Sequence, residues 1–399
     1  GIVQTATGME QQIEELARRV GMDPIAFRRR NLRADDAPGP IGQELVGRPP
    51  VHATLDALER LCRRPPPAAP PAARWRHARG AALITKNDGL GKAMPQASRV
   101  RLTLREDGRI EAAMSLVDMG QGVNGAAALA TRRALGVAGD DVICRLGDSM
   151  ATPDAGPTVA DRGAGALHRA VACAAPDFRN LLLSAAALRL GLCADALALG
   201  PGGIWRDRTG DNGPVMSFAD LAREGEFGVE GVHPGRSTPS DMPEAAGTFV
   251  AAGAVADLWI DSATGRVVVE ALDVAVGAGP VMSPRRYRAQ LEGGLAMGMG
   301  FAVTERLGSA EGRFSASNID SYLPPGFADA PHYRVEPVEA LLAGDAIEPR
   351  GVGEIGVIVG AAAIGVAASN AIAAPITRFP LDPAALRAAL RTPAFERTA

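Results

Sequence analysis

A run of uncharged residues from Ile355 to Ile376 is the strongest constraint that this sequence places on its own fold. The run is rich in Ala and Gly, contains Ser369 and Asn370, and has no Trp or Tyr at either end. It is long enough to cross a bilayer, but membrane helices favour larger apolar residues and aromatic residues at their ends. The composition therefore favours a closely packed buried helix in a protein without a membrane span.

A glycine-spaced turn with one carboxylate, Arg350-Gly351-Val352-Gly353-Glu354-Ile355-Gly356, leads into this run. Glu354 would lie at the start of the apolar helix, where the helix dipole favours an anion. A carboxyl group against a buried wall has a perturbed pKa and can serve as a base. Taken alone, however, a Glu at this position more often simply stabilises the start of a helix.

The composition limits the classes of function. The chain has 399 residues, of which 47% are hydrophobic and 4% aromatic, and its net charge is −3. Such a chain can bury a large core as two or three units, and it lacks the basic charge and aromatic residues of a nucleic-acid surface. The four cysteines are far apart and form no C-x-x-C pair, so local spacing builds neither a zinc site nor an iron–sulfur site. Few thiols in a long chain fit a reducing compartment, and we expect a cytoplasmic location.

Periodicity and turn signals predict an α+β fold with two related units. A helical segment spans residues 1–64, and a Pro/Ala linker follows at 65–78. A first unit, 79–243, runs strand, turn, strand and helix. A second unit, 244–399, repeats this order and adds the Glu354 turn and the closing helices. Two such units packed face to face would leave a ligand crevice between them.

Three further segments combine small residues with groups that bind ligands. The turn 118–122, with Gly120, Gln121 and Gly122, follows a predicted strand and lets the backbone approach a ligand. The loop 153–162 can present backbone amides to an anion, although Asp161 is equally suited to cap a helix. Gln290 begins a stripe of small residues that close helix packing would also explain. Each segment alone has an ordinary structural explanation.

Several catalytic motifs fail. Residues 86–93 end like a P-loop, but Lys86 stands where the first Gly is needed and Ala93 where Ser or Thr is needed. The sequence contains neither H-E-x-x-H nor G-x-S-x-G. Hydrolytic zinc or serine chemistry therefore has no local support.

In this order, the segments together resemble the molybdenum-binding large subunit of the xanthine dehydrogenase/aldehyde oxidase family. Residues 118–122 match its "EMGQG" turn, and residues 147–162 resemble its "GD…PD.GPT.ASR" loop. Residues 290–294 match "Q.EGG", and residues 351–356 match "KGVGE.G". The resemblance covers essentially the whole chain, and the combination is specific although no single segment is.

The resemblance implies a molybdenum cofactor held by a pterin dithiolene, often as a cytosine dinucleotide, with no direct protein ligand to the metal. Glu354 would be the general base in the hydroxylation of an electron-poor carbon, with water as the oxygen source. Lys86-Asn87 together with Gly89-Leu90-Gly91 resembles the bacterial purine-hydroxylase branch, which favours a purine-like N-heterocycle over an aldehyde. The residues expected to bind the cofactor are Gly120, Gln121, Gly122, Ala160, Asp161, Arg162, Gln290, Gly351 and Gly353.

The resemblance also implies partners. Electrons would leave through 2Fe-2S clusters on an iron–sulfur subunit, with FAD on a further subunit. The family's loop arginine would lie just before Gly1, so the chain resembles the C-terminal half of a subunit and would pair with an upstream half.

Two departures from the family pattern leave alternatives open. Asp161 stands where the family usually has Ser, and its charge would repel an anionic cofactor unless Arg162 offsets it. Val276-Gly277 stands where many members carry His-Asp. One alternative is therefore a non-catalytic or degenerate assembly half of a molybdenum hydroxylase complex. An unrelated α+β ligand-binding protein is a third alternative with little support.

Overall fold

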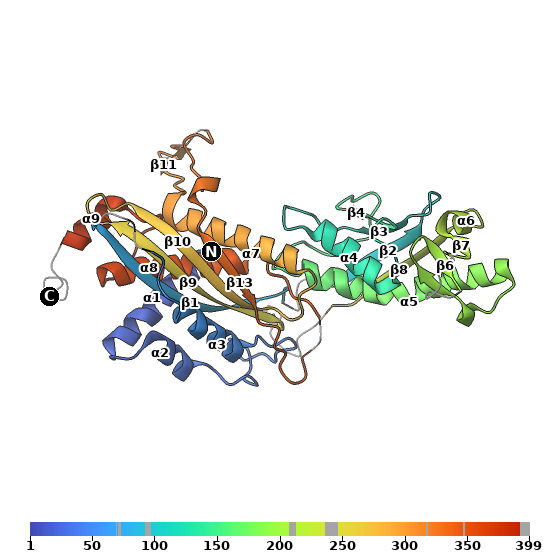
Figure 1. The fold of residues 1–399 in the computed structure, drawn as a ribbon, viewed down its shortest axis with the longest axis horizontal. Coiled ribbons are helices and arrows are strands. Elements are labelled where there is room, and N and C mark those ends of the chain that lie inside the picture. The colour runs from blue at the N-terminus through green and yellow to red at the C-terminus, as the bar shows by residue number, and fades with distance from the viewer. Residues whose placement is uncertain are drawn as a thin grey trace.

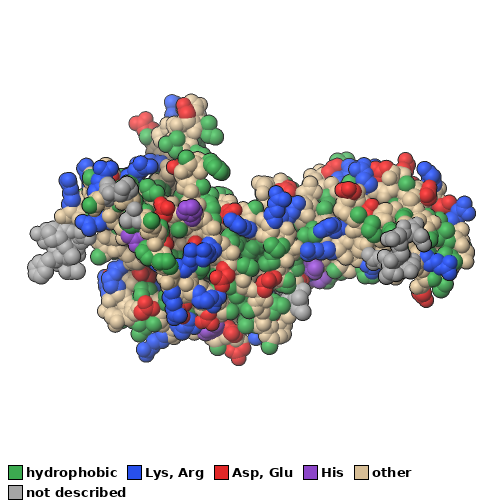
Figure 2. Space-filling view, in the orientation of Figure 1, with side chains coloured by type: hydrophobic (Ala, Val, Ile, Leu, Met, Phe, Trp, Pro, Cys, Tyr) green, Lys and Arg blue, Asp and Glu red, His purple; other side chains and the backbone are tan. Residues whose placement is uncertain are grey.

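The computed structural model describes residues 1–68, 70, 73–91, 97–206, 213–235, 246–316, 318–345 and 348–391. The described chain is elongated, and two bodies lie one beyond the other along its long axis (Figure 1). Each body has its own four-stranded sheet with helices packed against it, which confirms the predicted α+β class. On the face in Figure 2, acidic and basic side chains are interspersed over both bodies.

The larger body is built on a sheet with the strand order β1-β9-β10-β13. β1 (Trp75–Asn87) pairs antiparallel with β9 (Phe249–Asp261), and β9 pairs antiparallel with β10 (Val267–Gly277). β13 (His332–Pro337) is parallel to β10. Almost every residue of β9 is buried because helices cover both faces of the sheet.

The apolar run forms α8 (Ile355–Ile372), which packs against β1 and β9 on one face of the sheet. Its neighbours on that face are α7 (Pro284–Met299) and α1 (Ile2–Arg19), while α3 (Val51–Cys62) covers the opposite face. Most of α8 is buried, which confirms the predicted closely packed core helix. Shorter elements of this body are α2 (Pro24–Asn31), η2 (Gly300–Thr304), β11 (Ser309–Ala310), β12 (Arg313–Phe314), η3 (Phe327–Asp329) and α9 (Pro383–Arg391).

The smaller body has a sheet with the strand order β4-β3-β2-β8. Its strands are β2 (Ser98–Leu104), β3 (Ile110–Met114), β4 (Val142–Leu146) and β8 (Phe227–His233). α4 (Val123–Leu135) and α5 (Gly163–Leu190) pack against this sheet and complete a separate apolar core. The remaining elements are η1 (Ala194–Ala196), β5 (Ala198–Gly200), β6 (Gly203–Trp205), β7 (Met216–Ser217) and α6 (Phe218–Ala222).

Two described helices, α5 and α8, are long and apolar enough to cross a membrane by length and composition. Of the apolar window of α8, 83% is buried inside the protein, against 39% for α5. The core helix of a globular domain meets the same criteria, so α8 is accounted for by its place against the sheet.

Strand pairing corrects the start of the first predicted unit. Residues 79–87 were assigned to that unit from the sequence, but they belong to β1 and pair with β9 in the larger body. Asn87 lies opposite Phe249, so the smaller body is inserted between two neighbouring strands of the larger sheet. Local periodicity identifies a strand but not its partner, and this partner lies far away in the sequence.

The predicted linker also ends earlier than expected. β1 begins at Trp75, so the last residues of the predicted linker 65–78 are already in the sheet. Residues 69 and 71–72 of that linker lie outside the described residues, as does the predicted boundary at 243–244.

Candidate functional site

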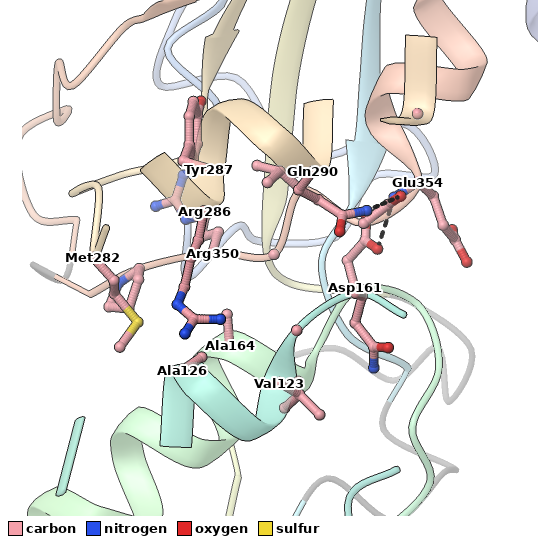
Figure 3. A pocket seen from close by; sticks show the side chains of 18 of the residues that line it. Val123, Ala126, Asp161, Ala164, Met282, Arg286, Tyr287, Gln290, Arg350 and Glu354 are labelled. Atoms are coloured by element: carbon pink, nitrogen blue, oxygen red, sulfur yellow. Dashed lines mark hydrogen bonds between the residues drawn. The ribbon is translucent and has the colours of Figure 1, made fainter. Parts of the chain in front are cut away.

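A cavity of about 600 Å³ lies where the two bodies meet. The starts of α4 and α5 line it from the smaller body, and α7 and the Glu354 turn line it from the larger body (Figure 3). The predicted site residues on its wall are Gly120, Gln121, Gly122, Ala160, Asp161, Gln290, Gly351, Gly353 and Glu354. The fold therefore brings together segments that are far apart in the sequence, and of the predicted set only Arg162 is not part of the wall.

Four helices, α4, α5, α7 and α8, begin at this cavity. None of the four has an acidic residue in its first turn or a hydrogen bond from the side chain of its own N-cap residue. Asp118 does accept the N–H groups of Gly122 and Asn124 at the start of α4, and Asp161 accepts that of Glu354 at the start of α8. A helix start carries a partial positive charge and N–H groups without helical partners. The cavity is therefore suited to an anionic ligand such as a phosphate-bearing cofactor.

Glu354 forms part of the wall at the start of α8, and its side chain is 49% exposed. The carboxylate Oε2 lies 2.9 Å from Lys86 Nζ. The backbone N–H of Glu354 donates to Asp161 Oδ1 at 3.0 Å. The carboxyl group is thus anchored on one side and open to solvent on the other.

Lys86 is a site residue that the sequence analysis did not identify as such. It is only 2% exposed, and Nζ lies 3.1 Å from Asp161 Oδ2 and donates to Asn87 O at 2.9 Å. A buried ammonium group requires charged partners, because desolvation of an unpaired charge is very unfavourable. In the sequence, Lys86 belongs only to an incomplete P-loop pattern and to the segment that resembles the purine-hydroxylase branch. Its place at the end of β1 brings it to Glu354.

Asp161 lies in a left-handed stretch of backbone, with φ of 60° after 51° at Ala160. A Cβ at Gly351 would lie 1.9 Å from Asp161 O, and one at Gly353 would lie 2.6 Å from Asp161 Oδ1. These glycines therefore make room for Asp161 as well as lining the cavity. Burial raises the pKa of Asp161, and Lys86 opposes that shift. Asp161 is not the N-cap of α5, which is Arg162.

A second carboxyl group, Asp88, lies behind Asp161. The N–H of Gly351 donates to Asp88 Oδ1 at 3.4 Å. Burial, together with the charge of Asp161, raises the pKa of Asp88 to about 7. Lys86 and Asp88 both lie near Asp161 because the end of β1 packs beside it. The sequence pattern does not reveal where this strand ends in space.

The two predicted glutamines are both engaged with the backbone. Gln121 Nε2 donates to Val117 O at 2.8 Å, and its Oε1 accepts from Met119 N at 2.5 Å, so the side chain closes its own turn. Gln290 Nε2 donates to Gly353 O at 3.2 Å and links α7 to the Glu354 turn (Figure 3). Gln121 therefore shapes the turn, whereas Gln290 positions the carbonyl beside Glu354.

Arg162 does not offset the charge of Asp161, the possibility that the sequence left open. The Arg162 side chain is buried away from the cavity and donates to backbone carbonyl groups. These bonds run from Nη1 to Ala155 O at 2.9 Å and to Pro157 O at 2.8 Å, and from Nη2 to Ala97 O at 2.9 Å. Arg162 thus fastens the loop before α5, and the cation beside Asp161 is Lys86.

Arg286 on α7 is a second cavity residue that the sequence analysis missed. It points across the cavity to the start of α4 (Figure 3), where a Cβ at Gly125 would lie 2.2 Å from its Cζ. Burial would raise the pKa of Asp118, but backbone N–H groups of the turn and the charge of Arg286 lower it overall. Arg286 lies one helical turn before Gln290, so the two side chains share a helix face, and this spacing could have indicated that Arg286 also faces the cavity.

The residues present fit an anionic pterin cofactor in size and charge. The cavity has a volume of about 600 Å³. The start of α5, which has no side-chain cap, and the Arg286 guanidinium group offer donors to phosphate oxygens. Among the described residues, no group of three or more His, Cys, Asp or Glu side chains is placed to hold a metal ion.

Curated relatives share this sequence pattern. The chain is 30% identical over 381 residues to a probable xanthine dehydrogenase subunit of Bacillus subtilis (strain 168), covering 95% of this chain and 50% of that protein. It is 27% identical over 387 residues to the aldehyde oxidoreductase molybdenum-binding subunit PaoC of Escherichia coli (strain K12), covering 94% and 49%. The chain therefore spans about half the length of these relatives.

Solved structures share the fold. Quinoline 2-oxidoreductase from Pseudomonas putida 86 superposes with a TM-score of 0.75 at 19% identity, over 97% of this chain and 52% of that one. The aldehyde oxidoreductase from Desulfovibrio desulfuricans ATCC 27774 gives 0.74 at 20% identity, over 98% and 40%. At this level of identity, the likeness establishes the architecture.

The family model described as the molybdopterin cofactor-binding domain matches residues 57–331, which is more than half of the chain. The match includes α4, α5, α7 and the cavity wall that they form. The chain belongs to the molybdopterin cofactor-binding domain family.

Proposed function

We propose that this chain is part of a molybdenum hydroxylase that oxidises an electron-poor carbon, with a purine-like N-heterocycle favoured over an aldehyde. The observation that carries the proposal is the position of Glu354, a half-exposed carboxylate on the wall of a cavity suited to an anionic pterin. When bound, the molybdenum cofactor supplies two-electron oxidation with oxygen taken from water.

Glu354 acts as the general base in this proposal. Glu354 is a residue of the cavity wall and its side chain is 49% exposed, so a proton can reach it from a water-derived oxygen. Its anchored side limits the directions in which the carboxylate can point, and Gln290 holds the adjacent Gly353 carbonyl. Restraint of this kind places a base within reach of a substrate before the reaction begins.

We further propose that the cofactor has a phosphate-bearing tail, in the cytosine dinucleotide form. The turn at Gly120 and Gly122, the backbone at Ala160 and the start of α5 line the cavity, and the start of α5 has no side-chain cap, so its N–H groups can approach an anion. Arg286 supplies a cation opposite the start of α4. A pterin with phosphate groups matches this set of donors better than an uncharged ligand does.

Partners complete the proposed enzyme. The relatives from Bacillus subtilis and Escherichia coli are named as subunits, and this chain spans about half of their length. We infer an upstream half of the large subunit, an iron–sulfur subunit with 2Fe-2S clusters and an FAD subunit. A cytoplasmic location is supported by the four free cysteines, which suit a reducing compartment.

The test uses the chain expressed with its upstream half and its iron–sulfur partner in a cofactor-competent host. We expect bound molybdenum and hypoxanthine-dependent dye reduction. Glu354→Gln should keep the molybdenum and lower kcat by roughly 10²–10⁴-fold, because the neutral amide cannot accept the proton. The matched control is Glu106→Gln at an exposed hairpin turn, which should leave both measurements unchanged. Metal-free protein from this host would instead favour the non-catalytic assembly half.

A further inference from the structure

We propose that Asp161 is a positioning residue that holds the Glu354 turn and divides the charge of Lys86 between two carboxylates. This inference rests on the proposed role of Glu354. It concerns a residue that the sequence identified as a departure from the family pattern and that the cavity geometry places beside the reacting carboxylate.

The geometry of the proposed device is a bridge with Lys86 at its centre. The ammonium group lies 3.1 Å from Asp161 Oδ2 and 2.9 Å from Glu354 Oε2. Asp161 Oδ1 simultaneously accepts the Glu354 backbone N–H at 3.0 Å. Asp161 is therefore coupled to Glu354 twice, through the backbone and through the shared cation.

The bridge is buried at one end and open at the other. The side chains of Lys86 and Asp161 are 2% and 4% exposed, whereas that of Glu354 is 49% exposed. A charge interaction in the buried part is little screened by water or salt. Lys86 and Asp161 consequently act on Glu354 as a fixed local field, and the exposed end remains free to exchange a proton.

The backbone shows that this arrangement is built into the fold. Asp161 has φ of 60°, a left-handed conformation that Asp and Asn tolerate better than most residues. Gly351 and Gly353 leave the space that its carbonyl and carboxylate occupy. Two glycines and a strained loop therefore serve to bring one carboxylate against the Glu354 turn.

The effect of Asp161 on Glu354 follows from the charges. If Lys86 faced Glu354 alone, its full positive charge would favour the ionised carboxylate and make it a weaker base. Asp161 offsets part of that charge and adds its own repulsion. Beyond the bridge lies Asp88, just after β1, and the charges that act on it are Asp161, Arg169 on α5 and Arg350 before the turn. Arg169 pairs with Glu348, and Arg350 pairs with Asp345.

Two substitutions separate this role from a merely structural one. Asp161→Asn keeps an acceptor for the Glu354 N–H and suits the left-handed backbone, but it removes the negative charge. Lys86→Met removes the positive charge with a side chain of similar length. The first should move proton uptake by Glu354 to lower pH and the second to higher pH, each by about one unit. A change in packing alone would not move the midpoint of Glu354 protonation in opposite directions in the two variants.

The first readout needs no cofactor. The full chain is labelled with ¹³C at the Glu carboxyl carbon and titrated by NMR, with the Glu354 signal identified by its loss in Glu354→Gln. Asp177→Asn, at an exposed site on α5, is the matched charge control and should not move that signal. Should Lys86→Met fail to fold, Lys86→Arg provides a second check, because it keeps the charge and should leave the midpoint within a few tenths of a unit.

The second readout is the pH dependence of kcat/KM in the cofactor-loaded complex. The acidic limb should move to lower pH in Asp161→Asn, and kcat should fall about tenfold because the base is weaker. Opposite NMR shifts without turnover in any complex would support the bridge and reject the proposed function. Unchanged or same-sign shifts of the Glu354 signal in the two variants would overturn the inference itself, even in an active enzyme.

Discussion

At the scale of single residues, the two buried basic side chains Lys86 and Arg162 have different roles. Lys86 faces two carboxylates and so belongs to the chemistry of the cavity. Arg162 faces backbone carbonyl groups and so belongs to the framework. The guanidinium group suits the second task because its donors fan out in a plane and can satisfy several carbonyls together. The partners, and not the burial, distinguish the two roles.

Replacing Arg162 tests the framework role. Arg162→Met keeps much of the volume but leaves the carbonyls of Ala155, Pro157 and Ala97 without this donor. We expect the free energy of unfolding to fall by roughly 2–4 kcal/mol in urea titrations. Arg133→Met, at an exposed position on α4, is the control and should change stability by less than about 0.5 kcal/mol. Equal effects of the two substitutions would contradict the assignment.

Asp88 gives a prediction about pH. Its pKa is raised from 3.8 to about 7 in the folded protein, so the folded state holds this proton more tightly than the unfolded chain does. Its contribution to stability is complete below about pH 4 and is lost as the pH rises towards 7, by up to about 1.4 kcal/mol per unit. Asp88→Asn should remove this decline between pH 4 and 7 in denaturant titrations. An unchanged slope in the variant would show that another group is responsible.

At the scale of elements, the crossing of α7 and α8 determines where Glu354 lies. A Cβ at Gly294 would lie 3.2 Å from Gly356 Cα, and one at Gly298 would lie 2.7 Å from Val357 O. The two backbones therefore pack directly on each other. The stripe of small residues in the sequence serves helix–helix contact, and the contact holds the start of α8 beside Gln290.

Neighbouring glycines on α7 provide a matched pair of substitutions. Gly298→Ala would place a methyl group against the backbone of α8 and should destabilise the protein by about 1–3 kcal/mol. Gly293→Ala has no atom within 4 Å of the new Cβ and should stabilise the helix by up to about 1 kcal/mol. Thermal unfolding of the chain without cofactor measures both. Destabilisation of similar size by the two changes would argue against the close crossing.

At the scale of the whole molecule, the smaller body is an insertion in a long hairpin. β1 and β9 run side by side up to Asn87 and Phe249, and the Asp88 N–H donates to Thr248 O at 2.8 Å. The chain leaves the larger sheet at this point, builds the smaller body and returns to the same place. The cavity lies where the two bodies meet, and Lys86 at the end of β1 reaches Asp161 and Glu354 on its wall.

This topology predicts that the larger body folds alone. Residues 92–245 can be replaced by a short Gly/Ser linker because Asp88 and Thr248, a few residues outside this segment, meet across a hydrogen bond. We expect a single cooperative transition in urea and slow amide exchange in β9. Removing only residues 98–146 is the control, since it deletes three strands of the smaller sheet and leaves α5 without its core. A non-cooperative transition in the first deletion would show that the bodies depend on each other.

The sequence by itself determined the class of the fold and indicated part of the cavity wall. The long uncharged run predicted α8, and the turn residues predicted the hairpins. The order of the short motifs pointed to nine residues that lie on the wall of one cavity. These features depend on neighbours within a few residues, so they are written in local sequence.

Only the tertiary structure decided which charges meet. The pairing of β1 with β9 brings Lys86 to Asp161 and Glu354, and it moves residues 79–87 out of the predicted first unit. The same packing turns Arg162 away from the cavity. Electrostatic contacts depend on distance in space. β1 pairs with a strand far away in the chain, and that pairing is stabilised by burial of both faces of the sheet. No local pattern encodes that choice.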